Sequence, residues 1–149
     1  MKEFKGRAVI PGECVAQARV THRKFDTYTA LEGSLSGVGR TARCADRADS
    51  ELFGKEIKGR ALCLPTTTGS ELGSLVLYCL CELERQPACL LLSGEIDITL
   101  CAGAVLASVW KRGVSMPVID RLGEEFLDFL KDGMTVSVFA DGTVKVEQM

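Results

Sequence analysis

The sequence predicts a single α/β domain, residues 1–149, with a β-hairpin at each end and β-α-β-α-β units between them. Three observations support this class. Apolar residues recur at helical spacing over residues 72–83, a short continuous apolar run follows at residues 88–94, and two alternating segments near the C-terminus flank Asp141-Gly142. A chain of 149 residues with 46% hydrophobic content is long enough to bury one core.

The N-terminal part combines a predicted hairpin with an irregular segment. Residues 4–10 and 13–20 alternate in polarity around Pro11-Gly12, a strong turn signal, so we expect two strands that pair with each other. Residues 21–54 are polar and show no sustained period. A long segment of this kind inside a domain is typically functional or ordered by a partner.

The middle of the chain alternates strands with helices. Residues 57–64 are expected to form a strand, and the best helix of the sequence follows, with one apolar stripe over residues 72–83 and an end before Pro87. Residues 88–94 have the continuous apolar character of a strand that is covered on both faces. Residues 96–110 are expected to form a second helix with Asp97 near its start.

The last third continues the pattern. Residues 115–120 are expected to form a strand, and residues 124–133 a short helix with acidic residues at its beginning, Lys131 near its end, and Gly133 closing it. The C-terminal segments around Asp141-Gly142 form the strongest predicted hairpin.

Composition excludes several classes of partner. A net charge of −2 gives no basic footprint for nucleic acid. The N-terminus lacks the apolar region of a signal peptide, and no apolar stretch reaches the roughly 18 residues of a membrane span, so we expect a cytoplasmic protein with no membrane partner. The seven cysteines are scattered and are expected to be small buried hydrophobic residues. Cys79 and Cys81 come closest to a metal-binding pair, but helical register points them apart, so this chain is expected to hold no metal.

The most informative stretch is the junction between the predicted strand and helix at residues 64–72, "LPTTTGSEL". A helix N-terminus after a glycine-containing turn offers N–H donors and the positive end of the helix dipole, which suit an anionic oxygen. Ser70 stands there, and its roles as helix cap, ligand contact and catalytic residue are all open from the pattern alone. The stretch lacks the G-x-S-x-G and GK[ST] signatures, so it favours neither a hydrolase nor a nucleotidase.

Over nearly its whole length the chain resembles the small subunit, or swivel domain, of the aconitase X family of dehydratases. The resemblance lies in residues 4–20, 52–80 and 86–120, in that order. At the junction the family pattern is similar to P-x-x-R-G-S-x-x-x-S, and Pro65, Gly69, Ser70 and Ser74 occupy the matching places. The resemblance implies that Ser70 is the catalytic base and that Thr67, Thr68, Gly69 and Ser74 bind substrate.

The same resemblance implies a swivelling β/β/α fold that packs on a larger, aconitase-like subunit. That subunit would carry an iron-sulfur cluster as Lewis acid, with none bound by this chain alone, and the complex would be a hydro-lyase acting on a small hydroxy acid. Of the family's substrates we favour cis-3-hydroxy-L-proline, which would give a cyclic imine acid, with mevalonate 5-phosphate as the alternative. The chain departs from the family in two places, because Thr68 stands where the pattern has arginine and residues 24–37 replace an aromatic-Gly-Gly loop. These departures motivate a second hypothesis, a non-catalytic binding or regulatory module with the same fold.

Overall fold

The structure is a computed structural model that describes residues 1–36, 39–111 and 113–148. In these ranges the chain forms eight strands, four α-helices and one short 3-10 helix. They are β1 (Lys2–Lys5), β2 (Arg7–Ile10), β3 (Cys14–Val20), α1 (Thr27–Leu31), η1 (Glu32–Leu35), β4 (Ala61–Leu64), α2 (Glu71–Glu82), β5 (Cys89–Leu92), α3 (Ile98–Trp110), β6 (Val118–Asp120), α4 (Glu124–Phe129), β7 (Thr135–Val138) and β8 (Thr143–Val146).

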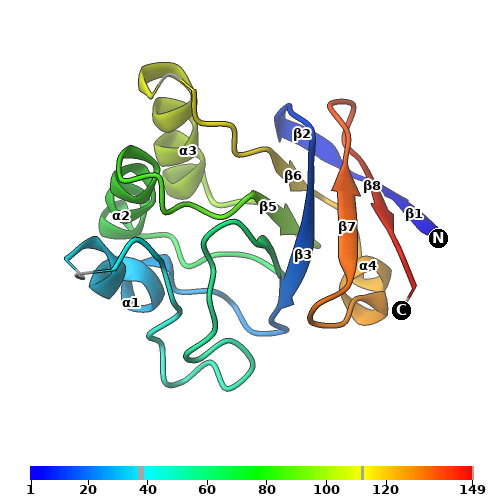
Figure 1. The fold of residues 1–149 in the computed structure, drawn as a ribbon. Coiled ribbons are helices and arrows are strands. Elements are labelled where there is room, and N and C mark those ends of the chain that lie inside the picture. Colours follow the sequence, from blue (N-terminus) through cyan, green and yellow to red (C-terminus); the bar gives the residue numbers. More distant parts are fainter. Residues whose placement is uncertain (37–38, 112, 149) are drawn as a thin grey trace.

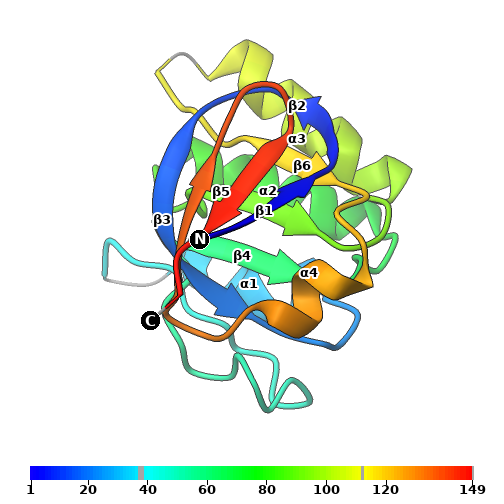
Figure 2. The ribbon, with the colours of Figure 1, turned by 90° about the vertical axis from the view of Figure 1, so that its right-hand side faces the viewer.

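The strands form one sheet in the order β1-β8-β7-β3-β4-β5-β6-β2. The two edge strands, β1 and β2, are consecutive in the sequence and are separated only by Gly6, so the sheet closes into a barrel-like shape (Figure 2). Gly6 marks the point where the chain passes from one end of the strand order to the other. A Cβ atom at this position would lie 2.4 Å from the carbonyl oxygen of Asp120, so only glycine fits there.

The β-α-β-α-β units predicted from the sequence are confirmed. Strands β3, β4, β5 and β6 are parallel neighbours, and α2 and α3 are the crossovers between β4 and β5 and between β5 and β6. Helices α1, α2 and α3 lie together on one side of the sheet, and α4 lies on the opposite side (Figure 1). Leu64 of β4 is the register partner of Leu92 of β5, so the carboxyl ends of these strands meet at one edge.

The core has two parts because side chains alternate along the buried strands. On β4, Leu62 and Leu64 point toward the helical layer, whereas Ala61 and Cys63 point into the barrel. Phe126 of α4 fills the barrel side and is fully buried. Burying a leucine or phenylalanine side chain contributes about 1.5–3 kcal/mol each, so both parts stabilise the fold.

The cysteines are free thiols, and the predicted burial is confirmed for four of the seven: Cys44, Cys63, Cys81 and Cys89. Burial raises the pKa of Cys63 and raises that of Cys81 to about 11, so both are protonated thiols at neutral pH. Cys79 is only half-buried, because its helical position turns it away from the core side that holds Cys81.

Two predicted elements differ from the structure. The prediction of an N-terminal hairpin is wrong, because β2 pairs with β6 and β3 pairs with β7 and β4. Pro11-Gly12 does turn the chain between β2 and β3. The reason is that barrel closure sends the two strands to different neighbours. The helix predicted over residues 124–133 ends at Phe129, and Gly133, with φ of 88°, instead forms the turn before β7. The C-terminal hairpin, β7 with β8, is confirmed.

The irregular segment, residues 21–54, has more order than its sequence indicates. It contains α1 and η1, and it contributes Phe25, Ala30, Leu31 and Leu52 to the core on the helical side of the sheet. Its short elements explain the absence of a periodic signal. Residues 37 and 38 of this segment lie outside the described residues.

Candidate functional site

Ser70 is the N-cap of α2, and the cap predicted from the junction is confirmed. Its backbone is extended, with φ of −146° and ψ of 127°, and its Oγ accepts a hydrogen bond from the N–H of Gly73 at 3.3 Å. A cap of this kind stabilises a helix by about 1 kcal/mol. The side chain is only partly buried, so the hydroxyl stands at the surface where the N–H groups of the first turn and the positive end of the helix dipole are concentrated.

The threonines before Ser70 are held on both sides. The N–H of Phe25 donates to the carbonyl oxygen of Thr66 at 2.9 Å, and the N–H of Thr68 donates to the carbonyl oxygen of Phe25 at 2.8 Å. On the other side, Thr66 Oγ1 donates to the carbonyl oxygen of Glu95 at 2.8 Å, and Thr67 Oγ1 donates to the carboxylate of Asp97. Loop residues 65–70 are therefore clamped between the start of the irregular segment and the turn after β5.

Asp97 brings the N-termini of α2 and α3 together. Its Oδ2 caps α3 by accepting from the N–H of Leu100 at 2.9 Å, while its Oδ1 accepts from Thr67. Gly69 lies directly beside it, since a Cβ atom there would be 3.9 Å from Asp97 Oδ2. Two helix N-termini thus converge at the carboxyl ends of two parallel strands, which is where α/β sheets bind ligands.

Of the residues expected to bind substrate, Thr68 and Gly69 lie on the surface side of this loop, with Thr68 half-buried and Gly69 exposed. Thr67 is only 2% exposed, and its hydroxyl is used to hold the loop. Ser74 lies one turn into α2 and faces α3, because a Cβ atom at Gly103 would be 2.4 Å from Ser74 Oγ. Substrate contact by these residues stays a prediction.

A salt bridge at the next strand end is a feature that sequence reasoning missed. Asp120 ends β6, is fully buried, and accepts from Arg7 Nε at 2.9 Å and Nη2 at 2.7 Å and from the N–H of Ile96 at 3.1 Å. Arg7 also lines an open pocket of about 380 Å³ together with Ile96, Ile98 and Cys101. The only sequence signal for this site is a carboxylate at the end of an apolar strand.

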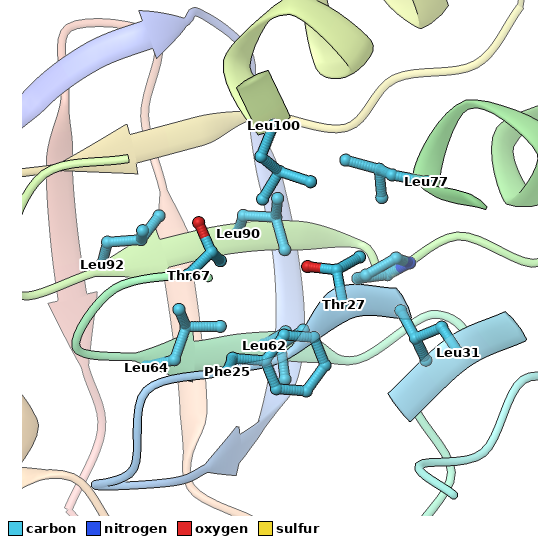
Figure 3. Close-up of a pocket in the computed structure, with 11 residues that line it drawn as sticks. Phe25, Thr27, Leu31, Leu62, Leu64, Thr67, Leu77, Leu90, Leu92 and Leu100 are labelled. Carbon is cyan, nitrogen blue, oxygen red and sulfur yellow. The ribbon is translucent and has the colours of Figure 1, made fainter. Parts of the chain in front are cut away.

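An enclosed cavity behind the loop is a packing gap and not a ligand site. It holds about 10 Å³ and is lined mostly by leucines of β4, β5, α2 and α3, with the hydroxyls of Thr27 and Thr67 at its wall (Figure 3). This volume is about that of a single water probe. The candidate site is therefore the surface formed by Thr68, Gly69, Ser70 and the first turns of α2 and α3.

The groups that would activate Ser70 are sparse. The single histidine, His22, hydrogen-bonds through Nδ1 to Glu51 at 2.9 Å.

Among the described residues, no group of three His, Cys, Asp or Glu side chains is arranged to hold a metal ion. No helix in the described part of the chain is long and apolar enough to span a membrane.

Three comparisons place this geometry among known proteins. The family profile described as Aconitase X swivel domain matches residues 3–146. The phosphomevalonate dehydratase small subunit of Thermococcus onnurineus is 28% identical over 147 residues, covering 98% of this chain and 99% of that protein. The protein of the same name in Methanosarcina mazei is 32% identical over 136 residues, 91% and 84% of the two chains. The crystal structure of Thermococcus kodakaraensis aconitase X in its holo-form superposes with a TM-score of 0.81 at 24% identity, covering 99% of this chain and 100% of that one.

Proposed function

The chain belongs to the aconitase X swivel-domain family, and we propose that it is the small subunit of a dehydratase in which Ser70 is the base. The observation that carries the proposal is the position of Ser70: a partly exposed hydroxyl on the N-terminus of α2, next to the N-terminus of α3. The relative from Thermococcus onnurineus is named a small subunit, and a large subunit would be the partner of this chain.

In such a reaction the base removes a proton from the carbon next to a carboxylate, the C–O bond on the neighbouring carbon breaks with loss of hydroxide, and a double bond forms between the two carbons. The proton and the hydroxide together make up the water that is lost. Ser70 would take the proton through Oγ. The N–H groups and dipole of α2 stabilise negative charge there by at most ~2 kcal/mol. This is too little to ionise a serine at neutral pH, so a second chain must supply the remaining activation.

The iron-sulfur cluster implied by the family does not fit this chain. Cys63 and Cys89 point into the barrel, and burial keeps Cys63 a protonated thiol, whereas cluster ligands are thiolates. Hydrogen bonding with Cys14 and burial likewise raise the pKa of Cys89. We therefore propose that the ligands lie on the large subunit.

We propose mevalonate 5-phosphate as the substrate in place of cis-3-hydroxy-L-proline, because the two relatives reported above are named phosphomevalonate dehydratase small subunits. Both compounds are small hydroxy acids, and two converging helix N-termini suit the anionic groups of either. Thr68 lacks the bidentate geometry of the arginine in the family pattern, so an anionic group would be held by backbone N–H donors instead.

The test is a purified complex of this chain with the aconitase-like large chain of the same genome, assayed for water loss from both compounds. Ser70→Asn keeps an N-cap but removes the hydroxyl, so α2 should stay intact while the rate falls by about 100-fold or more. Ser70→Ala should lose both rate and about 1 kcal/mol of stability. If Ser70→Asn retains the full rate, Ser70 is only a cap. If the native complex assembles but turns over neither compound, the chain is a non-catalytic module.

A further inference from the structure

The layer of α2 and α3 exposes apolar side chains on the side that faces away from the sheet. We call this surface the α2–α3 outer face, and its large members are 40% to 88% exposed. They are Leu72 and Leu75 on α2 and Ile98, Val105, Leu106, Val109 and Trp110 on α3.

Helix α3 is apolar on its core side and on its solvent side, and its only hydroxyl side chains are Thr99 and Ser108. Its core side consists of Leu100, Gly103, Ala104 and Ala107, which are buried. Ile98, Val105 and Val109 lie on the opposite side at helical spacing, and Ile98–Trp110 contains no Asp, Glu, Lys or Arg. Helices that are apolar all round are buried in proteins, so the solvent side of α3 is expected to be covered in the assembled molecule.

Helices α2 and α3 pack against each other beneath the outer face. Gly103 of α3 lies against Ser74 of α2, and the rings of Tyr78 and Trp110 meet edge to face with centroids 6.0 Å apart. Helices α2 and α3 accordingly run next to each other in Figure 1. The exposed apolar residues of α3 therefore lie in the same helical layer as those of α2, and Trp110 joins the two helices.

The size of this surface fits a stable interface. A half-exposed aromatic side chain presents on the order of 100 Å², and aliphatic side chains present less, so the seven members present up to about 700 Å². This upper value is comparable to the roughly 300–600 Å² of the largest patch on a typical monomer and to the ~800 Å² that one partner contributes to a standard interface. Trp110 is 64% exposed, so it does not belong to the core, and tryptophan is enriched among residues that dominate interfaces.

We propose that the α2–α3 outer face is the surface on which the large subunit docks. This inference rests on the proposed function. Leu72 lies two residues after Ser70, and Ile98 directly follows Asp97, so a chain that covers this face also reaches the two helix N-termini. A second copy of this chain would bring only the same face toward the site, whereas the proposed reaction needs groups that this chain does not supply.

Two substitutions test the surface without weakening α3. Ile98→Glu places an acidic residue in the first turn and Val109→Lys a basic residue in the last turn, and both charges are favourable for the helix dipole. Val15 is the matched control for Val109, because the two valines are 70% and 66% exposed and Val15 lies on β3. Each full-length variant is titrated with the purified large subunit by calorimetry, and its mass is measured by light scattering.

We expect Ile98→Glu and Val109→Lys each to weaken binding at least about tenfold, and Val15→Lys to leave it unchanged. Binding equal to the native chain in both variants would overturn the proposal, as would a native chain that does not bind the large subunit. A native chain that is a dimer alone, and becomes monomeric with Val109→Lys, would assign the face to a second copy. Because binding is measured without turnover, a complex that assembles through this face but is inactive refutes the proposed reaction and leaves the docking surface standing.

Discussion

The carboxylate of Asp97 serves two structural roles, and replacing it with alanine should destabilise the protein by about 2–4 kcal/mol. Loss of the N-cap on Leu100 contributes about 1 kcal/mol. The hydroxyl of Thr67, which is 2% exposed, loses its acceptor, and an unsatisfied buried hydroxyl costs about 1–3 kcal/mol. Against a typical total stability of about 5–15 kcal/mol, this loss is easy to measure by urea unfolding at pH 7.

Two further variants separate the roles of Asp97. Asp97→Asn keeps one acceptor oxygen, which can preserve the cap on the Leu100 N–H, while its NH2 group can only donate to Thr67 Oγ1, so its midpoint should shift by less than that of Asp97→Ala. Thr67→Val removes the hydroxyl while keeping its shape, so combining it with Asp97→Ala should cost at least about 1 kcal/mol less than the sum of the single changes.

Two outcomes would refute this reasoning. A loss below about 0.5 kcal/mol for Asp97→Ala would mean that neither hydrogen bond is important for stability. Strict additivity with Thr67→Val would mean that the buried hydroxyl finds another acceptor. In either case the loop before Ser70 would be held by its contacts with Phe25 and Glu95.

Gly103→Ala should destabilise the protein by about 1–3 kcal/mol in thermal unfolding despite the higher helix propensity of alanine, because the new methyl group would lie 2.6 Å from the carbonyl oxygen of Ser74. Gly33→Ala, which meets nothing within 4 Å, is the control, and equal melting temperatures would contradict the expected clash. The hydrogen bond to Glu51 raises the pKa of His22 above its usual ~6.5, so this pair stabilises the fold fully below pH ~6.5 and loses that contribution as pH rises through the folded-state pKa. NMR titration of this sole histidine should show the raised pKa, and Glu51→Gln should return it toward 6.5; an unshifted native value would argue against the pair.

Local patterns predicted the parts of the fold that depend on neighbouring residues. Helical spacing and a cap residue define α2 and α3, and Asp141-Gly142 defines the C-terminal hairpin. The strand predicted over residues 13–20 was located correctly as β3, whereas the one predicted over residues 4–10 is two strands, β1 and β2. Their pairing was also wrong, because β2 finds its partner β6 more than 100 residues along the chain. A turn signal such as Pro11-Gly12 fixes where the chain reverses, and the closed sheet decides which strands meet.

The same distinction between local patterns and contacts distant along the chain applies to the candidate site. The cap at Ser70 follows from residues 69–73, so the sequence predicted it. The pair of Arg7 and Asp120 joins positions 113 residues apart, and no local pattern links them. The resemblance at the junction placed Ser70 and Ser74 together, but it gave no information on the direction of the Ser74 side chain, which depends on how closely α3 approaches at Gly103.

The passage of the chain through Gly6 has a consequence for synthesis. Strand β1 pairs with β8, so residues 2–5 wait for a partner, Thr143–Val146, that is synthesised long after them. Residues 2–5 therefore remain without a strand partner until β8 has been translated, and contacts so distant along the chain slow folding. We expect the β4-α2-β5-α3-β6 unit to assemble first and the pairing of β1 with β8 to close the sheet as its final step.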